Sequence, residues 1–377
     1  MQRVLKNIIK KLLFRLLPKD RVLFESYPDF SDNTRCVYDE LVRKGYNKKY
    51  KFVWVLQDED PERCPEEDNV SCIPLNDERA YSYHVRRAKA VISCNRMLGS
   101  YVPEQFSFYV EHGAPFKLSS VYQQAPSAHL GYYLSSSAQS AGMRKEFLKI
   151  RDDTQIISFG FPRNDVFYKP ELDLKDLFKS SCEKFIAWYP TFRNHKYEQR
   201  NEGCDPLPVI HDTENAIKLN EVAKQLNTLI VLKPHPVQDL KLIQGLRLSN
   251  ITFITDSFFD ERQIKNYDFL HSCDALLSDY SSVFLDFLLA DKPIGLVWED
   301  IDQYTKDLGL VENYKYLASG CEKIYTIEDL IDFVISVAKG EDHLISERRE
   351  VRDYMHTDSR GHSTENVVDL IINKAGL

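Results

Sequence analysis

Two histidines lie in short, stiff turns that directly follow apolar runs of the sequence. His112 belongs to the motif His-Gly-Ala-Pro-Phe-Lys at 112–117, and His235 belongs to Lys-Pro-His-Pro at 233–236. Gly113 permits a sharp turn, and the prolines of both motifs restrict the backbone. Because imidazole changes its protonation state near neutral pH, each histidine could act as a general base or contact a phosphate. Taken alone, each also suits a purely structural position in a strand-end loop.

A third motif, Ser-Asp-Tyr-Ser-Ser at 278–282, lies between an apolar run and a predicted helix. The hydroxyls of Ser281 and Ser282, together with the free N–H groups at the start of a helix, favour an anion such as a phosphate. Serines at this place also cap helices, so the motif on its own has two interpretations. Asp279 is expected to orient the turn.

Two arginines lie in further turns after apolar runs. Arg163 belongs to Gly-Phe-Pro-Arg-Asn-Asp at 160–165 and could bind a ligand phosphate or pair with Asp165. Arg193 ends Tyr-Pro-Thr-Phe-Arg at 189–193 and could bind phosphate or lie on the surface. The same motifs supply four more candidate contacts to an anionic ligand: Lys117, Pro190, Thr191 and Lys233.

The sequence lacks the motifs of several other enzyme classes. It contains no Gly-x-Gly-x-x-Gly fingerprint, P-loop, Gly-x-Ser-x-Gly elbow or metal-binding helix motif, which argues against a dehydrogenase, a P-loop ATPase and a serine hydrolase. A net charge of −8 argues against a nucleic-acid-binding protein. No cluster of carboxylates points to a metal, so we expect neither a metal nor another cofactor. The eight cysteines show no zinc-site spacing and are expected to be reduced thiols.

Residues 1–18 have the pattern of an amphipathic helix that Pro18 ends. Apolar residues recur at helical spacing, Leu12 and Leu13 among them, and lysines lie on the other side. The basic residues Arg3, Lys6, Lys10, Lys11, Arg15 and Lys19, against Asp20 alone, give residues 1–20 a net charge of +5. The apolar run is too interrupted to span a bilayer. The pattern predicts a helix in the interface of an anionic membrane, or one that packs on the protein's own surface.

The elements that position these turns form two series of short apolar strands separated by helices. The predicted strands are 22–25, 52–56, 70–73, 90–93, 107–110, 132–134 and 155–158, then 185–188, 229–232, 251–254, 275–277 and 294–297. The predicted helices include 34–44, 213–226, 282–290 and 365–374. This alternation predicts two doubly wound α/β domains with parallel sheets, at 20–175 and 180–355, that face each other across a cleft. A C-terminal helical segment, 356–377, can pack back on their junction. Every motif follows a strand, which is where ligands of such sheets bind.

Together these motifs resemble the CDP-glycerol glycerophosphotransferases of teichoic-acid and capsule synthesis. The family pattern has five blocks in a fixed order: His-Gly-x-x-x-Lys, Gly-x-Pro-Arg-x-Asp, Pro-Thr-x-Arg, His-Pro and Asp-Tyr-Ser-Ser. The chain contains all five in that order over about residues 21–370, and residues 361–367 resemble the family's closing segment. Ala114 and Phe116 depart from the pattern, and no Pro-Gly-Pro precedes residues 317–320. Single addition and polymerisation therefore both stay open.

The resemblance implies a GT-B-like fold and a reaction in which an acceptor hydroxyl attacks the β-phosphorus of CDP-glycerol and releases CMP. His112, in the acceptor-side N-terminal domain, is then the expected general base. His235, in the nucleotide-donor domain, is the expected phosphate contact, and Asp279 would orient the serine turn or contact glycerol. The groups expected to stabilise the charge that develops during transfer are Arg193, Ser281, Ser282 and, more weakly, Lys117.

The resemblance also implies the partners. The donor would be CDP-glycerol or another CDP-polyol, and the acceptor a lipid-linked glycan. A basic amphipathic helix at 1–18 would hold such an enzyme at the cytoplasmic face of the membrane as a peripheral protein. Three alternatives stay open: a CDP-ribitol-dependent ribitolphosphotransferase, a GT-B glycosyltransferase with a nucleotide-sugar donor, and an inactive membrane-docked binding protein.

Overall fold

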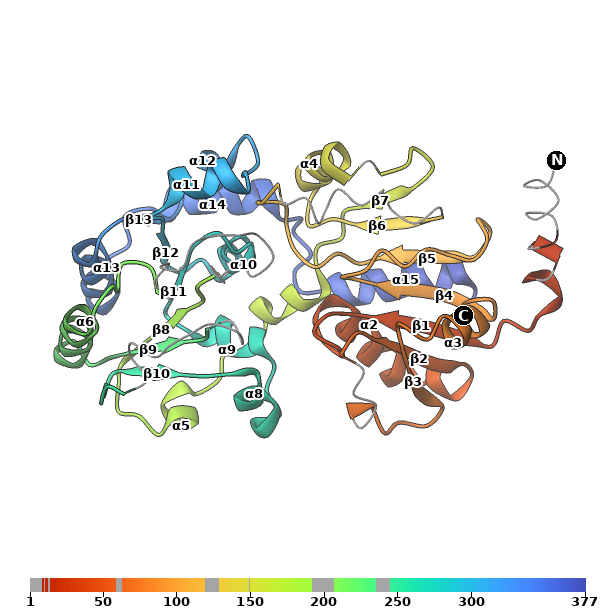
Figure 1. Ribbon diagram of the computed structural model, residues 1–377, viewed down its shortest axis with the longest axis horizontal. Coiled ribbons are helices and arrows are strands. Elements are labelled where there is room, and N and C mark those ends of the chain that lie inside the picture. Colours follow the sequence, from red (N-terminus) through yellow and green to blue (C-terminus); the bar gives the residue numbers. More distant parts are fainter. Residues whose placement is uncertain are drawn as a thin grey trace. The chain divides into compact units, whose positions relative to one another are not determined.

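The computed structural model of the 377-residue chain describes residues 9, 11–12, 14–58, 63–118, 129–148, 150–191, 207–234 and 245–377. The chain divides into two compact units, which are described separately below (Figure 1). Unit 1 comprises Met1–Ala114, Ser120–Asp165 and Met355–Leu377, and unit 2 comprises Pro115–Ser119 and Val166–Tyr354.

Unit 1 contains a seven-stranded parallel sheet with the strand order β3-β2-β1-β4-β5-β6-β7. Its strands are β1 (Arg21–Glu25), β2 (Lys51–Leu56), β3 (Val70–Pro74), β4 (Ala88–Ser93), β5 (Phe106–Tyr109), β6 (Tyr132–Leu134) and β7 (Gln155–Ile157). Its helices are α2 (Asp32–Arg43), η1 (Tyr46–Lys48), α3 (Glu78–Val85), α4 (Ala138–Leu148) and α15 (Ser363–Ala375), and η4 (Pro162–Tyr168) leads into unit 2.

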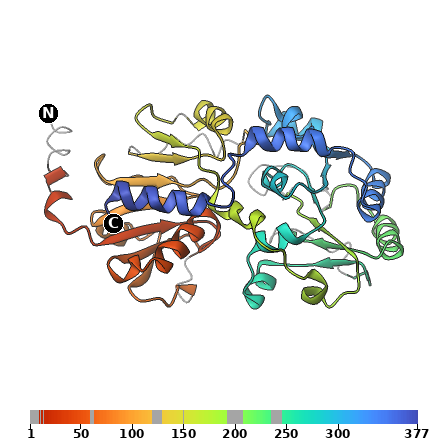
Figure 2. The ribbon, with the colours of Figure 1, turned by 180° about the vertical axis from the view of Figure 1, so that it is seen from behind.

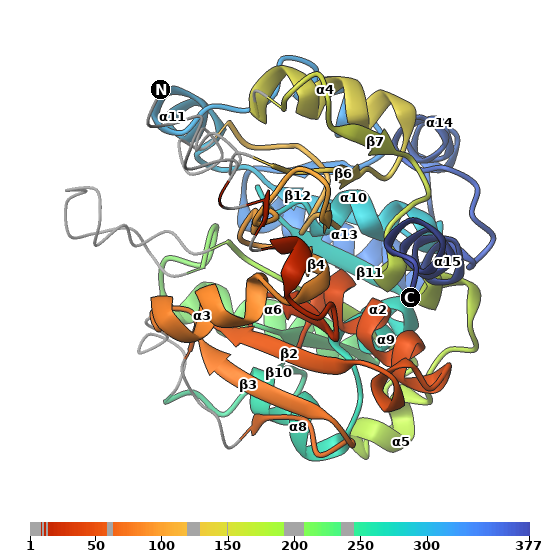
Figure 3. The same cartoon turned by 90° about the vertical axis from the view of Figure 1, so that its right-hand side faces the viewer.

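Apolar side chains on both faces of the central strands explain why helices cover this sheet on both sides. On one face, Tyr38 of α2 packs edge-on against Phe24 and Phe52. The helix α15 packs against α2. It lies behind the strands of this sheet in Figure 1 and in front of them in Figure 2, which shows the molecule from behind. Because neighbouring residues of a strand point to opposite faces, Leu23 and Val53 lie on the other side, where they pack against Val85 of α3 (Figure 3).

Unit 2 contains a six-stranded parallel sheet with the order β10-β9-β8-β11-β12-β13. Its strands are β8 (Lys184–Trp188), β9 (Thr228–Leu232), β10 (Ile251–Phe253), β11 (Ala275–Ser278), β12 (Ile294–Val297) and β13 (Glu322–Ile324). Its helices are α5 (Leu174–Phe178), α6 (Thr213–Gln225), α8 (Asp256–Arg262), α9 (Asn266–Ser272), α10 (Val283–Phe287), η5 (Leu288–Ala290), α11 (Ile301–Asp307), α12 (Tyr314–Leu317), α13 (Ile327–Lys339) and α14 (Ile345–Met355). The helices α6 and α13 bury their apolar stripes, including Leu219 and Leu330, against Ile230 and Leu277 of the strands.

Every predicted strand overlaps an observed one, and the named strands all pair in parallel, as the sequence predicts. The predicted helix 34–44 begins two residues earlier, at Asp32, and 282–290 divides into α10 and η5. The sequence does not predict β13, because Glu322 and Lys323 give this edge strand no apolar run.

A short segment of the first histidine motif is part of unit 2 rather than unit 1. Lys117 forms an isolated antiparallel bridge with Leu310, and the backbone N–H of Val311 donates to the Phe116 carbonyl at 3.0 Å. The ring of Phe116 packs edge-on against Phe284 at 4.8 Å. The motif therefore divides after Ala114, although the predicted N-terminal domain, 20–175, contains all of it.

Of the predicted N-terminal helix, 1–18, the structure describes residues 9, 11, 12 and 14–18, of which 9, 11, 12 and 14–16 are helical. The candidate membrane residues Lys6, Lys10 and Leu13 lie outside the described residues, whereas Lys11, Leu12 and Arg15 lie within them. The side chains of Ile9, Leu12 and Leu16 are exposed. Lys11 Nζ lies 2.6 Å from Glu104 Oε1. In the part of the chain that the structure describes, no helix is both long and apolar enough to span a bilayer.

The expectation that all cysteines are reduced is wrong for one pair. Cys64 and Cys72 form a disulfide. Cys72 lies in β3, and Cys64 lies eight residues earlier in the segment that leads to this strand. Their Cα atoms are 5.9 Å apart, a separation that a disulfide can bridge. The free cysteines among the described residues are Cys36, Cys94, Cys182, Cys273 and Cys321.

Candidate active site

The turn that carries His112 follows β5 in unit 1, and a buried glutamate holds it in place. Glu111 has φ +59°, in the left-handed region, so the chain turns sharply as it leaves the strand. Its carboxylate accepts the backbone N–H of His112 at 3.0 Å and that of Gly113 at 3.4 Å. The hydroxyl of Tyr133, in neighbouring β6, donates to the other oxygen of Glu111. The backbone around His112 is therefore fixed before any ligand binds.

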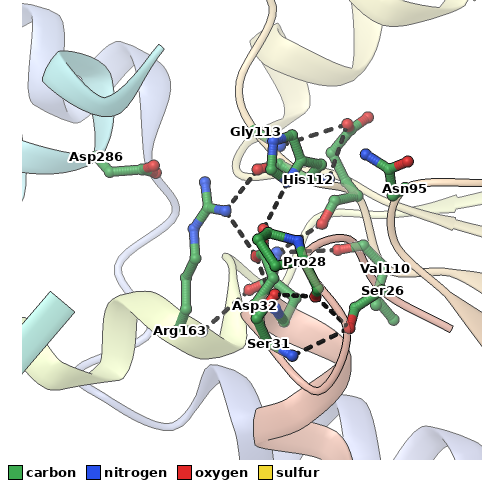
Figure 4. Close-up of polar contacts among 12 residues, drawn as sticks. Ser26, Pro28, Ser31, Asp32, Asn95, Val110, His112, Gly113, Arg163 and Asp286 are labelled. Atoms are coloured by element: carbon green, nitrogen blue, oxygen red, sulfur yellow. Dashed lines mark hydrogen bonds and ion pairs between the residues drawn. The ribbon is translucent and has the colours of Figure 1, made fainter. Parts of the chain in front are cut away.

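The imidazole of His112 contacts a buried ion pair. Its Nδ1 lies 2.6 Å from Asp32 Oδ2, and Arg163 Nη1 donates to Asp32 Oδ1, also at 2.6 Å (Figure 4). Arg163 also donates to the His112 carbonyl. The side chains of Asp32 and Arg163 are 7% exposed, whereas that of His112 is 42% exposed. His112 is thus anchored on its buried side and open to a ligand on the other.

Asn33 ties together the three segments that supply this site. Its side-chain amide donates to the Val110 carbonyl at 3.1 Å and to the Glu111 carbonyl at 2.7 Å. Its Oδ1 accepts the backbone N–H of Arg163 at 3.0 Å. The start of α2, the turn after β5 and the start of η4 are therefore locked to one another.

Arg163 pairs with Asp32 and not with Asp165, its neighbour in the same motif. The carboxylate of Asp165 instead accepts the backbone N–H groups of Ser363 and Thr364 at 2.9 and 2.8 Å. These are the first residues of α15, whose free N–H groups need such acceptors. The motif therefore fastens the last helix of the chain to unit 1 and also supplies Arg163 to the site.

The charges of this cluster fix the chemistry that His112 can perform. Burial alone would lower the pKa of His112, but the adjacent Asp32 carboxylate outweighs it and raises that pKa above the ordinary value. Burial would raise the pKa of Asp32, but Arg163 and His112 lower it, so the carboxylate stays ionised. An ionised Asp32 accepts a proton-bearing Nδ1, which leaves Nε2 of the neutral imidazole as a free base.

In unit 2, three of the predicted motifs leave adjacent strands at the same edge of the sheet. Pro190 and Thr191 follow β8, Lys233 follows β9, and residues 279–282 follow β11. Since β8 lies between β9 and β11, these turns are neighbours. The parallel strands all present their carboxyl ends there, the side at which such sheets bind ligands.

Asp279 joins two of these turns. It is fully buried, and its carboxylate accepts the Thr191 backbone N–H at 2.9 and 3.0 Å. It also accepts the Thr191 hydroxyl and the backbone N–H of Tyr280, the latter at 2.6 Å. Asp279 therefore orients the turns after β8 and β11.

The other candidates in unit 2 differ in how far their polar groups are engaged within the chain. Ser281 Oγ accepts the backbone N–H of Val283 at 3.4 Å, but the Ser282 hydroxyl makes no capping bond to α10. Among the described residues, no carboxylate forms an ion pair with Lys117; burial lowers its pKa, and Asp279 opposes this shift. Lys233 Nζ pairs with Asp256 at 2.9 Å.

Two of the predicted residues, His235 and Arg193, lie outside the described residues. Within the described residues, no group of three or more histidine, cysteine, aspartate or glutamate side chains is arranged to hold a metal ion.

Asp32 and Asn33, the residues that orient His112 and its turn, are not predicted from the sequence. Both stand at a predicted helix start, where aspartate and asparagine are common as caps. The available signal was that they follow β1, as the other motifs follow their own strands.

Several known proteins are similar to this chain in sequence or in structure. A teichoic acid glycerol-phosphate primase of Bacillus spizizenii is 28% identical over 250 residues, which cover 63% of this chain and 57% of that protein. A teichoic acid ribitol-phosphate primase of the same organism is 24% identical over 336 residues, covering 81% of each chain. A solved structure of the wall teichoic acid polymerase TagF superposes with a TM-score of 0.74 at 19% identity, covering 100% of this chain and 97% of that one.

The structural likeness confirms the predicted GT-B-like fold of two parallel α/β units. The sequence model of one family, described as CDP-Glycerol:Poly(glycerophosphate) glycerophosphotransferase, matches residues 8–373. The match spans nearly the whole chain and includes all five motifs, so the chain belongs to this family.

Proposed function

We propose that the chain transfers glycerol phosphate from CDP-glycerol to a hydroxyl of a membrane-linked acceptor in teichoic-acid or capsular polymer synthesis. The observation that carries this proposal is the buried Asp32–Arg163 pair, which orients a half-exposed His112 in a member of this family. An alcohol is a poor nucleophile at neutral pH, and an oriented imidazole is the group suited to activate it.

In the proposed reaction the acceptor oxygen attacks the β-phosphorus of the donor. A bond forms between this oxygen and the phosphorus, and the bond from that phosphorus to the bridging oxygen breaks, so that CMP leaves with the bond's electrons. The hydroxyl proton passes to Nε2 of His112. Asp32 accepts a hydrogen bond from the Nδ1–H of the imidazole and stabilises the imidazolium that forms, and Arg163 keeps Asp32 ionised.

We propose that unit 2 binds the donor. The turns after β8 and β11 bring Thr191, Ser281 and Ser282 to the carboxyl edge of its sheet, and Lys117 adds a cation near Asp279. Such groups would stabilise the negative charge on the transferred phosphoryl group and on departing CMP. We assign further phosphate contacts to Pro190, Arg193, Lys233 and His235, with His235 acting on the β-phosphate.

We further propose that residues 20–175 serve the acceptor and 180–355 the donor, and that residues 1–18 bind the cytoplasmic face of the membrane as a peripheral anchor. The exposed side chains of Ile9, Leu12 and Leu16 support an interfacial helix. Lys11 would exchange Glu104 for an anionic head group. A lipid-linked acceptor and this anchor would place both reactants at one surface.

CDP-ribitol is the second candidate donor, because a ribitol-phosphate primase covers more of the chain than the glycerol-phosphate primase does. A donor screen distinguishes the candidates. Purified protein and acceptor-containing membranes are incubated with CDP-glycerol, CDP-ribitol or UDP-sugars, and the released nucleotide is measured. We expect CMP from CDP-glycerol. CMP from CDP-ribitol alone would establish the second candidate, and UDP from a nucleotide sugar would refute both.

A further inference from the structure

The order of the strands reverses in unit 1 between β1 and β4, and the loops at this point carry polar groups that the proposed mechanism does not use. From β1 the strand order runs to β2 and β3 on one side and to β4 through β7 on the other. The loops that leave β1 and β4 therefore diverge, and doubly wound sheets bind their ligands at such a point. The loop after β1 supplies Asp32, and the loop after β4 supplies Asn95 and Arg96.

A buried carboxylate fixes the backbone of this second loop. Glu25, the last residue of β1, is fully buried. Its oxygens accept the backbone N–H of Arg96 at 3.0 and 3.1 Å, that of Asn95 at 3.3 Å and the side-chain amide of Gln57 at 2.6 Å. Asn95 and Arg96 are thus held in a defined conformation although both reach the surface.

The side chains of this loop keep hydrogen-bond donors available. Arg96 Nε donates to Gln57 Oε1 at 3.2 Å, and Asn95 Oδ1 accepts from Gln57 Nε2 at 3.3 Å. Arg96 is exposed, and no carboxylate of the described residues forms an ion pair with it. Its two terminal NH₂ groups and the Asn95 amide nitrogen likewise have no partner among those residues. A guanidinium that is fixed at Nε and open at both ends suits the oxygens of a phosphate.

The loop is close to His112. Ser93 of β4 pairs with Tyr109 of β5, so Arg96 and His112 each follow the same pair by three residues. Adjacent strands are about 4.8 Å apart. Figure 4 shows Asn95 on the side of His112 that faces away from Arg163. In a polyol phosphate, a phosphate lies only a few bonds from the terminal hydroxyl, so a ligand with its hydroxyl at His112 could place its phosphate at this loop.

We propose that Asn95 and Arg96 bind the phosphate of a polyol-phosphate unit that the acceptor already carries. This inference rests on the proposed function and adds to it the residues that bind the acceptor; the description of the family itself names poly(glycerophosphate), an acceptor that ends in a polyol phosphate. Arg96 makes the charged contact, Asn95 adds a neutral one, and Gln57 positions both.

The test compares two acceptors that share one lipid anchor and differ only in a terminal glycerol phosphate. The KM values for acceptor and for CDP-glycerol are measured by CMP release for the full chain and for Arg96→Gln. We expect the variant to raise the KM for the phosphate-bearing acceptor by about tenfold or more. The KM for CDP-glycerol and that for the phosphate-free acceptor should change less than about twofold. Arg96→Lys should raise the KM for the phosphate-bearing acceptor less than Arg96→Gln does, because lysine keeps the charge but lacks the paired donors of the guanidinium.

Arg151→Gln is the matched control. Arg151 is another exposed arginine of unit 1, but it precedes β7 and so lies at the amino ends of the strands, whereas Arg96 lies at their carboxyl ends. It should change none of the constants, and both variants should keep the wild-type melting temperature. An unchanged acceptor KM in Arg96→Gln, an equal rise for both acceptors, or a rise in donor KM alone would overturn the inference while leaving the proposed function standing. If the wild type released no CMP from any CDP-polyol, both would fall.

Discussion

Asp32→Asn is the substitution that examines the proposed site most closely, because it removes one charge and almost no volume. Asp32 accepts from His112 Nδ1 and from Arg163, each at 2.6 Å. Without its charge, burial and Arg163 both lower the pKa of His112, and Glu111 is left to oppose them. The asparagine amide can also donate to Nδ1, which would put the imidazole proton on Nε2 and disable the base.

We expect Asp32→Asn to lower kcat/KM by about 10²–10⁴, the range that general-base catalysis contributes. Stability should also fall, because Arg163 loses its partner in a pair whose side chains are only 7% exposed. Removing one member of a buried pair costs about 3–5 kcal/mol, and the retained amide oxygen favours the lower end. CMP release must therefore be assayed well below the melting temperature of the variant, which circular dichroism provides.

A double-mutant cycle with His112→Ala separates a positioning role from a general loss of structure. If Asp32 acts through His112, Asp32→Asn should have little further effect on kcat/KM in the His112→Ala background. If the two losses multiply, or if folded Asp32→Asn keeps most of its activity, the assignment of Asp32 as the group that orients His112 is wrong.

Three further predictions concern the pH dependence of the reaction, the packing of glycines and the N-terminal segment. Because the base must be neutral and Asp32 raises the pKa of His112, kcat/KM of the wild type should rise with pH through a midpoint above the ordinary 6.5. Asp32→Asn should move this rise to lower pH. A midpoint at or below 6.5 in the wild type would contradict the assigned environment of His112. Gly320→Ala should destabilise unit 2 by about 3 kcal/mol in denaturant unfolding, since the added Cβ would lie 2.3 Å from the Arg348 Cα. Gly142→Ala, whose Cβ would have nothing within 4 Å, should be neutral or stabilising. Equal effects of the two substitutions would refute the packing argument. Deletion of residues 2–17 should abolish sedimentation with anionic vesicles and leave turnover of a soluble acceptor unchanged, and undiminished vesicle binding would rule out the proposed anchor.

The sequence predicts most of the fold because the central strands of a parallel sheet are continuous apolar runs. Trp54 and Ile186 are completely buried, and nothing in their segments competes with that pattern. The strand β13 lies at an edge of its sheet, where Glu322 and Lys323 can face water, so hydrophobicity does not reveal it. The Cys64–Cys72 disulfide depends on where the chain returns in space, which composition cannot show.

The candidate site was predictable only as far as its residues lie near one another in the sequence. His112 is visible because Gly113 and an apolar run mark its turn. Its partner Asp32 lies 80 residues earlier, where a helix start explains an aspartate equally well. Arg163 was expected to bind a phosphate of the ligand or to pair with Asp165 nearby. The fold instead places Asp32 beside the arginine and the start of α15 beside Asp165. Pairing across such separations follows from strand order, which no local pattern contains.

The measurement that tests the central claim most directly is the stoichiometry of transfer from CDP-glycerol to a membrane-linked acceptor, for the wild type and for His112→Gln. The account predicts one CMP for each phosphodiester formed by the wild type, and a loss of about 10² or more for His112→Gln at an unchanged melting temperature. CMP release without transfer in the wild type, or a folded His112→Gln variant that turns over at the wild-type rate, would contradict it.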